Sequence, residues 1–170
     1  MQLIKNGAFV EDKFMTVADD EPLPEGAAIV SLERWQAERD SLRTRNTPIG
    51  VRLKSGQEPS AIVEDLDQIA LVALEFPAYR NGRAYSYARL LRERHGFKGE
   101  LRAVGNVLRD QFQFMIRCGF DALEVADNIT PEIFAECAGF FTAFYQPAAD
   151  GKETVLSLRQ RLAARAQAAS

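Results

Sequence analysis

The sequence has few of the residues that build metal, redox and disulfide sites. It contains two cysteines and one histidine. Cys118 and Cys137 form neither a CxxC pair nor part of a four-thiolate set, so the usual ligands of an iron–sulfur centre are missing. There is no HxH or HExxH motif, and we therefore expect no transition-metal site. Both cysteines fall in apolar helical patterns, which predicts buried free thiols in a reducing compartment.

Long hydrophobic runs and nucleotide-binding glycine motifs are also missing. The longest apolar stretch, residues 69–74, ends at Glu75 and is far shorter than the roughly 20 residues of a membrane span. No signal peptide pattern opens the chain, so we expect a cytoplasmic protein that does not enter a membrane. Neither GxGxxG nor GxxxxGK[ST] occurs, and the residues therefore predict no dinucleotide site, no P-loop and no bound cofactor.

The charge of the chain is unevenly distributed. Its 170 residues carry a net charge of −3 and a pI near 5.3, which argues against general nucleic-acid binding. Residues 79–117 nevertheless hold eight arginines and Lys98 against three acids, a local net charge of +6. A basic region on an acidic protein suits an anionic ligand or an acidic partner.

Apolar segments alternate with helical patterns along most of the chain, which predicts an α/β protein with a mainly parallel sheet of about five βα units. Asn6 and Gly7 separate two short apolar runs, a pattern typical of a two-residue turn, so a β-hairpin should open the fold. The parallel strands are expected at residues 27–31, 49–53, 69–76, 101–104 and 122–125. The helices are expected at residues 32–42, 59–67, 84–95, 107–118 and 131–141.

Two arrangements of these units stay open at this point, a doubly wound sheet and a partial (β/α) barrel. The composition favours one domain, residues 1–147, in which residues 1–18 hold the hairpin and residues 27–146 the βα units. Residues 148–170 turn to Ala, Arg and Gln and are expected to form a helical or flexible tail.

One candidate site lies where two predicted strands end. The loop at residues 80–83 and the turn at Gly105 and Asn106 each lead into a helix, whose free N–H groups and dipole favour an anion. Arg83 and Arg109 would add guanidinium groups. We therefore predict an anion site formed by Arg83, Gly105, Asn106 and Arg109. The alternative is that the arginines lie on solvated helix faces and pair with nearby acids.

A second candidate site is a docking face. Tyr85, Arg89 and Arg92 follow i, i+4, i+7 spacing and should share one side of the helix at residues 84–95. Tyrosine and arginine dominate the energetics of many interfaces, so these residues, with Arg102, are predicted to contact a partner. An exposed helix face without a partner is the alternative. No catalytic residue is predicted, although Glu75 and Glu124 could act as an acid and a base if their strands are neighbours.

The segment at residues 76–125 contains the string GRxYSxARLLRERxGxxGELRAVGxVLRDQ. This string closely resembles the bacterial family DUF934, a domain of unknown function, most densely over residues 71–125. Asn81 and Asn106 depart from the family pattern, which usually has an aspartate at each position. A carboxylate role at either position is therefore in question for this chain.

The resemblance implies an association with assimilatory sulfate reduction, because family members tend to be encoded beside sulfite reductase and are loosely described as oxidoreductases. Since the chain has no flavin, nicotinamide or iron–sulfur signature, the expected function is that of an accessory protein. It would dock on sulfite reductase, or on an acidic electron donor such as a ferredoxin or flavodoxin, through its arginine-rich surface. The alternative is a small enzyme or sensor that binds sulfite, sulfate or phosphate, and whether the protein is an enzyme stays open.

Overall fold

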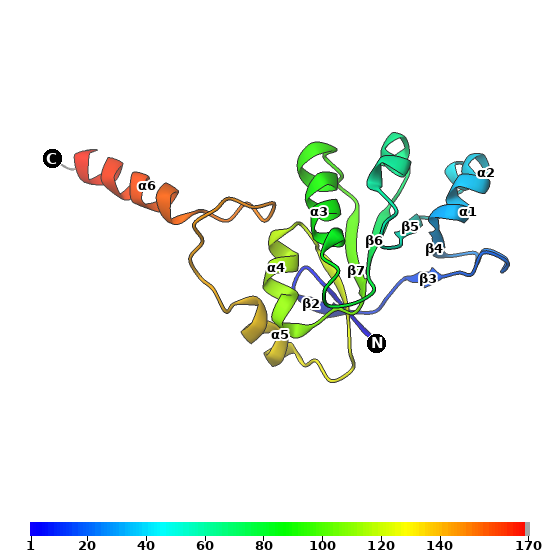
Figure 1. The fold of residues 1–170 in the computed structure, drawn as a ribbon, viewed down its shortest axis with the longest axis horizontal. Helices are drawn as coiled ribbons and strands as arrows, with labels where there is room; N and C mark the ends of the chain where they lie inside the picture. Colours follow the sequence, from blue (N-terminus) through cyan, green and yellow to red (C-terminus); the bar gives the residue numbers. More distant parts are fainter. Residues whose placement is uncertain (169–170) are drawn as a thin grey trace.

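Eight strands form one sheet in the order β2-β1-β8-β7-β6-β5-β4-β3. The structure, a computed structural model, describes residues 1–168 (Figure 1). The strands are β1 (Gln2–Lys5), β2 (Ala8–Val10), β3 (Phe14–Thr16), β4 (Ala27–Ser31), β5 (Ile49–Leu53), β6 (Leu71–Phe76), β7 (Glu100–Gly105) and β8 (Ala122–Val125). The helical elements are α1 (Leu32–Ala37), α2 (Arg39–Arg43), η1 (Pro59–Asp65), α3 (Arg83–Arg89), η2 (Leu90–Arg94), η3 (Arg109–Gln111), α4 (Phe112–Arg117), α5 (Pro131–Ala138) and α6 (Val155–Ala168).

Strands β3 to β8 are parallel and follow one another in chain order across the sheet. A doubly wound sheet reverses its direction of winding at a switch point, and this sheet has no such reversal. Right-handed crossovers in one continuous direction place the connecting helices on one side. The structure is therefore a curled half-barrel, and the doubly wound alternative is wrong.

The opening hairpin is confirmed. β1 and β2 are antiparallel, and the turn residues Asn6 and Gly7 have φ angles of 51° and 83°. Both residue types tolerate positive φ, which the tight turn requires. β1 also pairs antiparallel with β8, so the hairpin extends one edge of the sheet.

The structure departs from the predicted series of five βα units in several places. β3 adds a parallel strand beside β4 that the sequence pattern does not reveal. The connection from β5 to β6 is a 3₁₀ helix, η1, and the helix expected at residues 32–42 divides into α1 and α2 at Glu38. The last turns of the helix after β6 are π-helical, where the His95 N–H donates to the Leu90 carbonyl at 3.1 Å.

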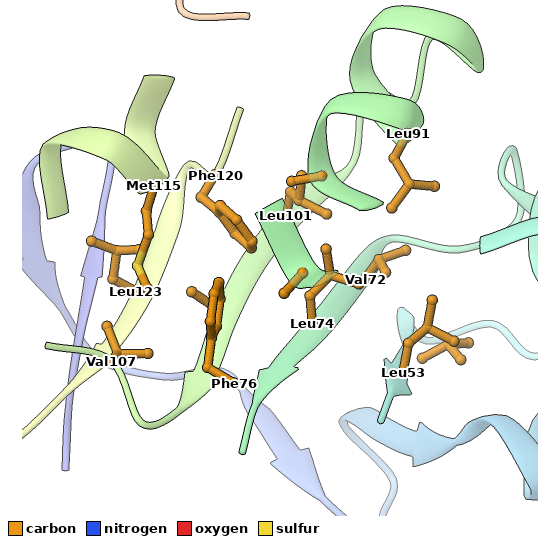
Figure 2. Packing of buried hydrophobic residues seen from close by; sticks show 14 of the residues in the cluster. Leu53, Val72, Leu74, Phe76, Leu91, Leu101, Val107, Met115, Phe120 and Leu123 are labelled. Atoms are coloured by element: carbon orange, nitrogen blue, oxygen red, sulfur yellow. The ribbon is translucent and has the colours of Figure 1, made fainter. Parts of the chain in front are cut away.

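The main core lies between the sheet and its helices. Trp35 of α1 and Phe112 of α4 are fully buried there. Figure 2 shows Val72, Leu74 and Leu101 of the sheet close to Leu91 of η2. Burial of such side chains provides most of the stabilisation available to a domain of this size.

The tail forms helix α6, which projects away from the sheet in Figure 1. Arg117 of α4 holds the segment that precedes α6. Its guanidinium contacts the Asp150 carboxylate at 3.2 Å and the Gln146 carbonyl at 2.7 Å. Within residues 1–168, no helix is long and apolar enough to cross a membrane.

A short strap closes the inner side of the half-barrel. β2 and β3 lie at opposite edges of the sheet, yet only residues 11–13 connect them. Four residue steps reach at most about 14 Å, whereas the edges of a flat eight-stranded sheet lie about 34 Å apart. The strap therefore requires the sheet to curl.

Arg102 anchors this strap from the inner face of β7. Its guanidinium donates to both carboxylate oxygens of Asp12, at 2.6 and 3.0 Å, and its Nε donates to Glu100 at 2.7 Å. The Arg102 side chain is only 1% exposed, and Glu124 lies 3.4 Å away. A buried guanidinium of this kind needs its carboxylate partners, since an unpaired buried charge is costly.

We expect Asp12→Ala to lower the free energy of unfolding by about 2–3 kcal/mol, because it removes two charge-assisted hydrogen bonds from a buried arginine. Urea denaturation measures this change. Glu11→Ala is the matched control, since Glu11 is an exposed residue of the same strap, and it should change the free energy by less than about 0.5 kcal/mol. Equal losses in the two variants would contradict the assigned role of Asp12.

The contribution of Asp12 should also depend on pH. Burial raises the pKa of Asp12, but hydrogen bonds from Arg102 and the Phe14 N–H and the charge of Arg102 outweigh it, so the pKa lies below its ordinary value of 3.8. A lowered carboxyl pKa gives stabilisation that is complete above the unfolded-state pKa, about 3.9, and is lost as the pH falls through the folded-state pKa. The difference in unfolding free energy between wild type and Asp12→Ala should therefore be constant above about pH 5 and shrink below about pH 4.

Candidate functional site

Half of the arginines in the basic region have partners inside the protein. Their recorded carboxylate contacts are Arg89 with Glu93, Arg92 with Asp121, Arg102 with Asp12, Glu100 and Glu124, and Arg117 with Asp150. The local charge of +6 in the sequence is therefore not a continuous basic patch. It divides into four arginines with carboxylate partners in the same chain and four exposed arginines, Arg80, Arg83, Arg94 and Arg109, for which no ion pair is recorded among residues 1–168.

Arg92 is a structural residue. Its guanidinium donates to the carbonyls of Phe97, Gly99 and Gly119 at 2.7, 2.8 and 2.9 Å. A fourth contact, at 2.9 Å, joins it to the Asp121 carboxylate, and its side chain is only 17% exposed. Arg92 therefore ties η2 to the chain entering β7 and β8, and most of its donors are already used inside the protein.

The predicted docking face does not form as one exposed surface. Tyr85 packs its ring against Phe76 and Phe114, with centroid separations of 4.9 and 4.7 Å. Burial raises the pKa of Tyr85 to about 12, so its phenol stays protonated at neutral pH. Arg89 is exposed but is held by Glu93, while Arg102 lies inside the half-barrel. Helical spacing alone could not show that Tyr85 and Arg92 would contact neighbouring segments.

The predicted anion residues lie at the carboxyl edge of the sheet, on two neighbouring connections. Phe76 and Gly105 are in register across β6 and β7, which brings the chain after each strand to the same place. Gly105 has a φ of 89°, and a Cβ there would lie 2.7 Å from the Phe76 carbonyl oxygen, so only glycine fits.

Several backbone donors of these connections are already used. The Asn106 N–H donates to the Phe76 carbonyl at 2.7 Å, and the Val107 N–H donates to the Gly105 carbonyl at 2.9 Å. The Arg83 N–H donates to the Asn81 side chain at 3.3 Å. These N–H groups are thus not free to bind an anion. Of the predicted anion site, the guanidinium groups of Arg83 and Arg109 remain as candidate donors.

An exposed group of side chains surrounds these connections, and we name it the carboxyl rim: Tyr79, Arg80, Leu108 and Arg109. Tyr79 and Leu108 are 62% and 37% exposed, and both arginines are exposed. None of the ion pairs recorded among residues 1–168 involves Arg80 or Arg109. The helix predicted at residues 107–118 starts later than expected, because the chain is extended at Leu108 and becomes α-helical only at Phe112.

A cleft of about 740 Å³ opens beside the rim, at the carboxyl ends of β3 to β6. Its charged and polar lining consists of Thr16, Asp19, Ser31, Arg52, Lys54, Ser55, Glu75, Asn81 and Arg83. Arg83 is the one predicted anion residue that lines this cleft, and Gly105, Asn106 and Arg109 lie outside its lining. Arg52 and Lys54 come from the end of β5, and no sequence motif marks them.

Glu75 and Glu124 do not lie on neighbouring strands, which was the condition for an acid–base pair, and Cys118 is a buried free thiol as predicted. Glu75 is on β6 and Glu124 on β8, and β7 lies between them. Burial raises the pKa of Cys118 to about 11, so its thiol is protonated at neutral pH and is a poor nucleophile.

Comparison with known families tests whether this chain belongs to the family that its arginine-rich string resembles. A family model described as DUF934, a bacterial protein of unknown function, matches residues 50–156, more than half of the chain. This chain belongs to the DUF934 family. The region matched to DUF934 runs from β5 to the start of α6 and contains Arg52, Arg83 and Arg109, whereas the hairpin, β3 and β4 lie outside it. No curated protein matches the chain.

We expect Arg92→Ala to lower the free energy of unfolding of this DUF934 protein by roughly 3 kcal/mol, because it leaves three carbonyls and the Asp121 carboxylate without their donor. Thermal or urea denaturation measures the loss. Arg94→Ala is the matched control on the same helix, since Arg94 is exposed, and it should change the free energy by about 0.5 kcal/mol or less. An Arg92→Ala protein as stable as the wild type would contradict this structural role, and Arg92 would again be a candidate for contact with a partner.

Proposed function

We propose that this DUF934 protein is a cytoplasmic accessory factor of assimilatory sulfite reduction that docks on sulfite reductase or on its acidic electron donor. The observation that carries the proposal is the carboxyl rim, where two exposed arginines flank the exposed side chains of Tyr79 and Leu108. The sulfur-assimilation setting comes from the family resemblance.

The composition of the rim suits protein docking. Tyrosine and arginine are the residue types that most often contribute large energies at interfaces, especially beside apolar contacts. Arg80 and Arg109 have no recorded carboxylate partner in the described chain, so a partner's acids would not have to displace an internal ion pair. By contrast, Arg89 would have to give up Glu93. The rim therefore replaces the face of α3 as the proposed contact surface.

The charge of the rim also suits an acidic partner. The whole chain is acidic, at −3, so a weak general attraction to acidic proteins is not expected. Locally exposed arginines can still orient an acidic partner and accelerate its association, and salt screens this effect. Association through the rim should therefore weaken as the ionic strength rises.

Binding measurements with purified sulfite reductase and with a ferredoxin or flavodoxin donor test the docking proposal. The double variant Arg80→Gln/Arg109→Gln should weaken association by about tenfold or more, and Tyr79→Ser should weaken it further. Raising the ionic strength from about 0.05 to about 0.3 M should weaken the wild type more than the double variant. Arg94→Gln, which removes an exposed arginine outside the rim, is the control for a loss of surface charge and should bind nearly like the wild type.

Either of two outcomes would refute the docking proposal. One is the absence of any association at low salt with both the reductase and the donors. The other is an affinity for the partner that is the same in the wild type, the rim variants and Arg94→Gln.

A small enzyme or sensor for an inorganic oxyanion is the second candidate. It is favoured by the register of β6 and β7, which brings the connections that carry Arg83 and Arg109 to the same edge of the sheet. If both guanidinium groups hold one sulfite, sulfate or phosphate ion, calorimetry should show binding to the wild type and a loss of about tenfold in Arg109→Ala. Equal or absent heats in the two proteins would exclude this candidate.

A further inference from the structure

The inner face of the half-barrel carries charged residues that are not explained by the fold alone. Arg52 lies between Val51 and Leu53 on β5, and both neighbours are buried in the main core. Because side chains alternate along a strand, Arg52 points to the opposite, inner face. Glu75 of β6 lies on the same face, and both residues line the cleft at the carboxyl edge.

Arg52 and Arg102 occupy this inner face but differ in their bonding. Arg102 is surrounded by acceptors and donates to Asp12 and Glu100. Arg52 has one recorded partner, the Glu75 carboxylate at 3.3 Å, and no recorded hydrogen bond within residues 1–168. Its Nε is buried without a recorded acceptor, but the side chain as a whole is 37% exposed. A guanidinium has five N–H donors, so the exposed part of this one has capacity for a ligand.

Neighbouring residues give the cleft a defined polar lining. Asn81 donates from Nδ2 to the Ser55 hydroxyl at 2.5 Å, which links the connection after β6 to the connection after β5. Arg83 lies two residues beyond Asn81 and is exposed in the same lining. At the end of β4 the Ser31 hydroxyl donates to Asp19, which follows β3, at 2.6 Å. The arginines of the lining thus come from β5 and from the connection after β6, and this hydroxyl–carboxylate pair comes from the ends of β3 and β4.

The size and the mixed charges of the cleft indicate the class of ligand. A volume of about 740 Å³ falls in the range of sites for small organic molecules and exceeds what one inorganic ion needs. Arg52 and Arg83 suit a phosphate or carboxylate group, which accepts paired hydrogen bonds from guanidinium. Asp19, Ser31 and Glu75 suit hydroxyl or amino groups on the rest of the molecule.

We propose that the cleft at the carboxyl edge of β3 to β6 binds a small polar organic anion, with Arg52 and Arg83 holding its anionic group. The location agrees with the general behaviour of βα folds, whose ligands gather at the carboxyl ends of parallel strands. The inference is independent of partner docking, because the docking variants alter Tyr79, Arg80 and Arg109, none of which lines the cleft.

Calorimetry at fixed ionic strength with O-phosphoserine, glycerol 3-phosphate, citrate and inorganic phosphate tests this site. At least one of the three organic anions should bind the wild type more tightly than inorganic phosphate does. Arg52→Gln and Arg83→Gln should each weaken that binding by about tenfold or more, and Arg52→Lys should restore it only in part, since lysine keeps the charge but not the planar fork. Arg94→Gln, at an exposed arginine outside the cleft, should bind like the wild type.

Glu75→Gln gives a second, opposite measurement. Glu75 competes with the ligand for the Arg52 guanidinium, and its carboxylate repels an anion. Its neutralisation should therefore strengthen binding of the same organic anion several-fold, a result that general unfolding could not produce. Circular dichroism confirms that each variant is folded.

Two results would overturn the proposed site. One is the absence of binding by every member of the panel to the folded wild type. The other is equal affinity in the wild type, Arg52→Gln and Glu75→Gln. Binding that is lost in Arg109→Ala but kept in Arg52→Gln would assign the anion to the β6 and β7 connections instead, and would likewise exclude the cleft.

Discussion

The contact between Arg102 and Asp12 is the interaction on which the shape of this protein depends. Asp12 belongs to the strap that joins the two edges of the sheet, and Arg102 lies on β7, near the middle of the same sheet. The short strap obliges the sheet to curl, and the curl buries Arg102 against Asp12 and Glu100. Removing a charged group from water is tolerable only because these carboxylates accept its hydrogen bonds. The curvature brings the ion pair together, and the ion pair stabilises the curled sheet.

The same curvature explains why the two faces of the sheet differ in what covers them. The outer face packs Val72, Leu74 and Leu101 against helices and forms the main core. The inner face cannot be filled by helices, because the continuous winding places them all outside. A small apolar cluster of Ile29, Leu71, Ala73 and Val104 fills part of it, and charged residues occupy the rest. At the carboxyl edge they leave a cleft around Arg52 and Glu75. The fold thus creates an inner polar site without any recognisable motif.

Much of the fold could be read from local patterns. The turn at Asn6 and Gly7, the strand at Ile49–Leu53 and the strand at Ala122–Val125 follow directly from turn chemistry and apolar runs. The candidate site could be read only in part. Arg83 does line a cleft, but its companions there, Arg52 and Lys54, lie about 30 residues earlier and meet it through strand pairing. Arg92 looked available for docking because helical spacing cannot show which carbonyls a long side chain reaches.

The α/β class, the opening hairpin, the family relationship and the concentration of arginines in one segment follow from the amino-acid sequence alone, since each of these depends on neighbouring residues or on a contiguous string. The winding of the sheet and the partners of each arginine depend on contacts between distant segments and could be seen only in the folded chain. A charge count records how many guanidinium groups a segment has, whereas their availability depends on acceptors far away in the chain. Asp12 lies 90 residues from Arg102. Because of that separation, the local charge count could not show that Arg102, in the most basic segment, is buried in an ion pair.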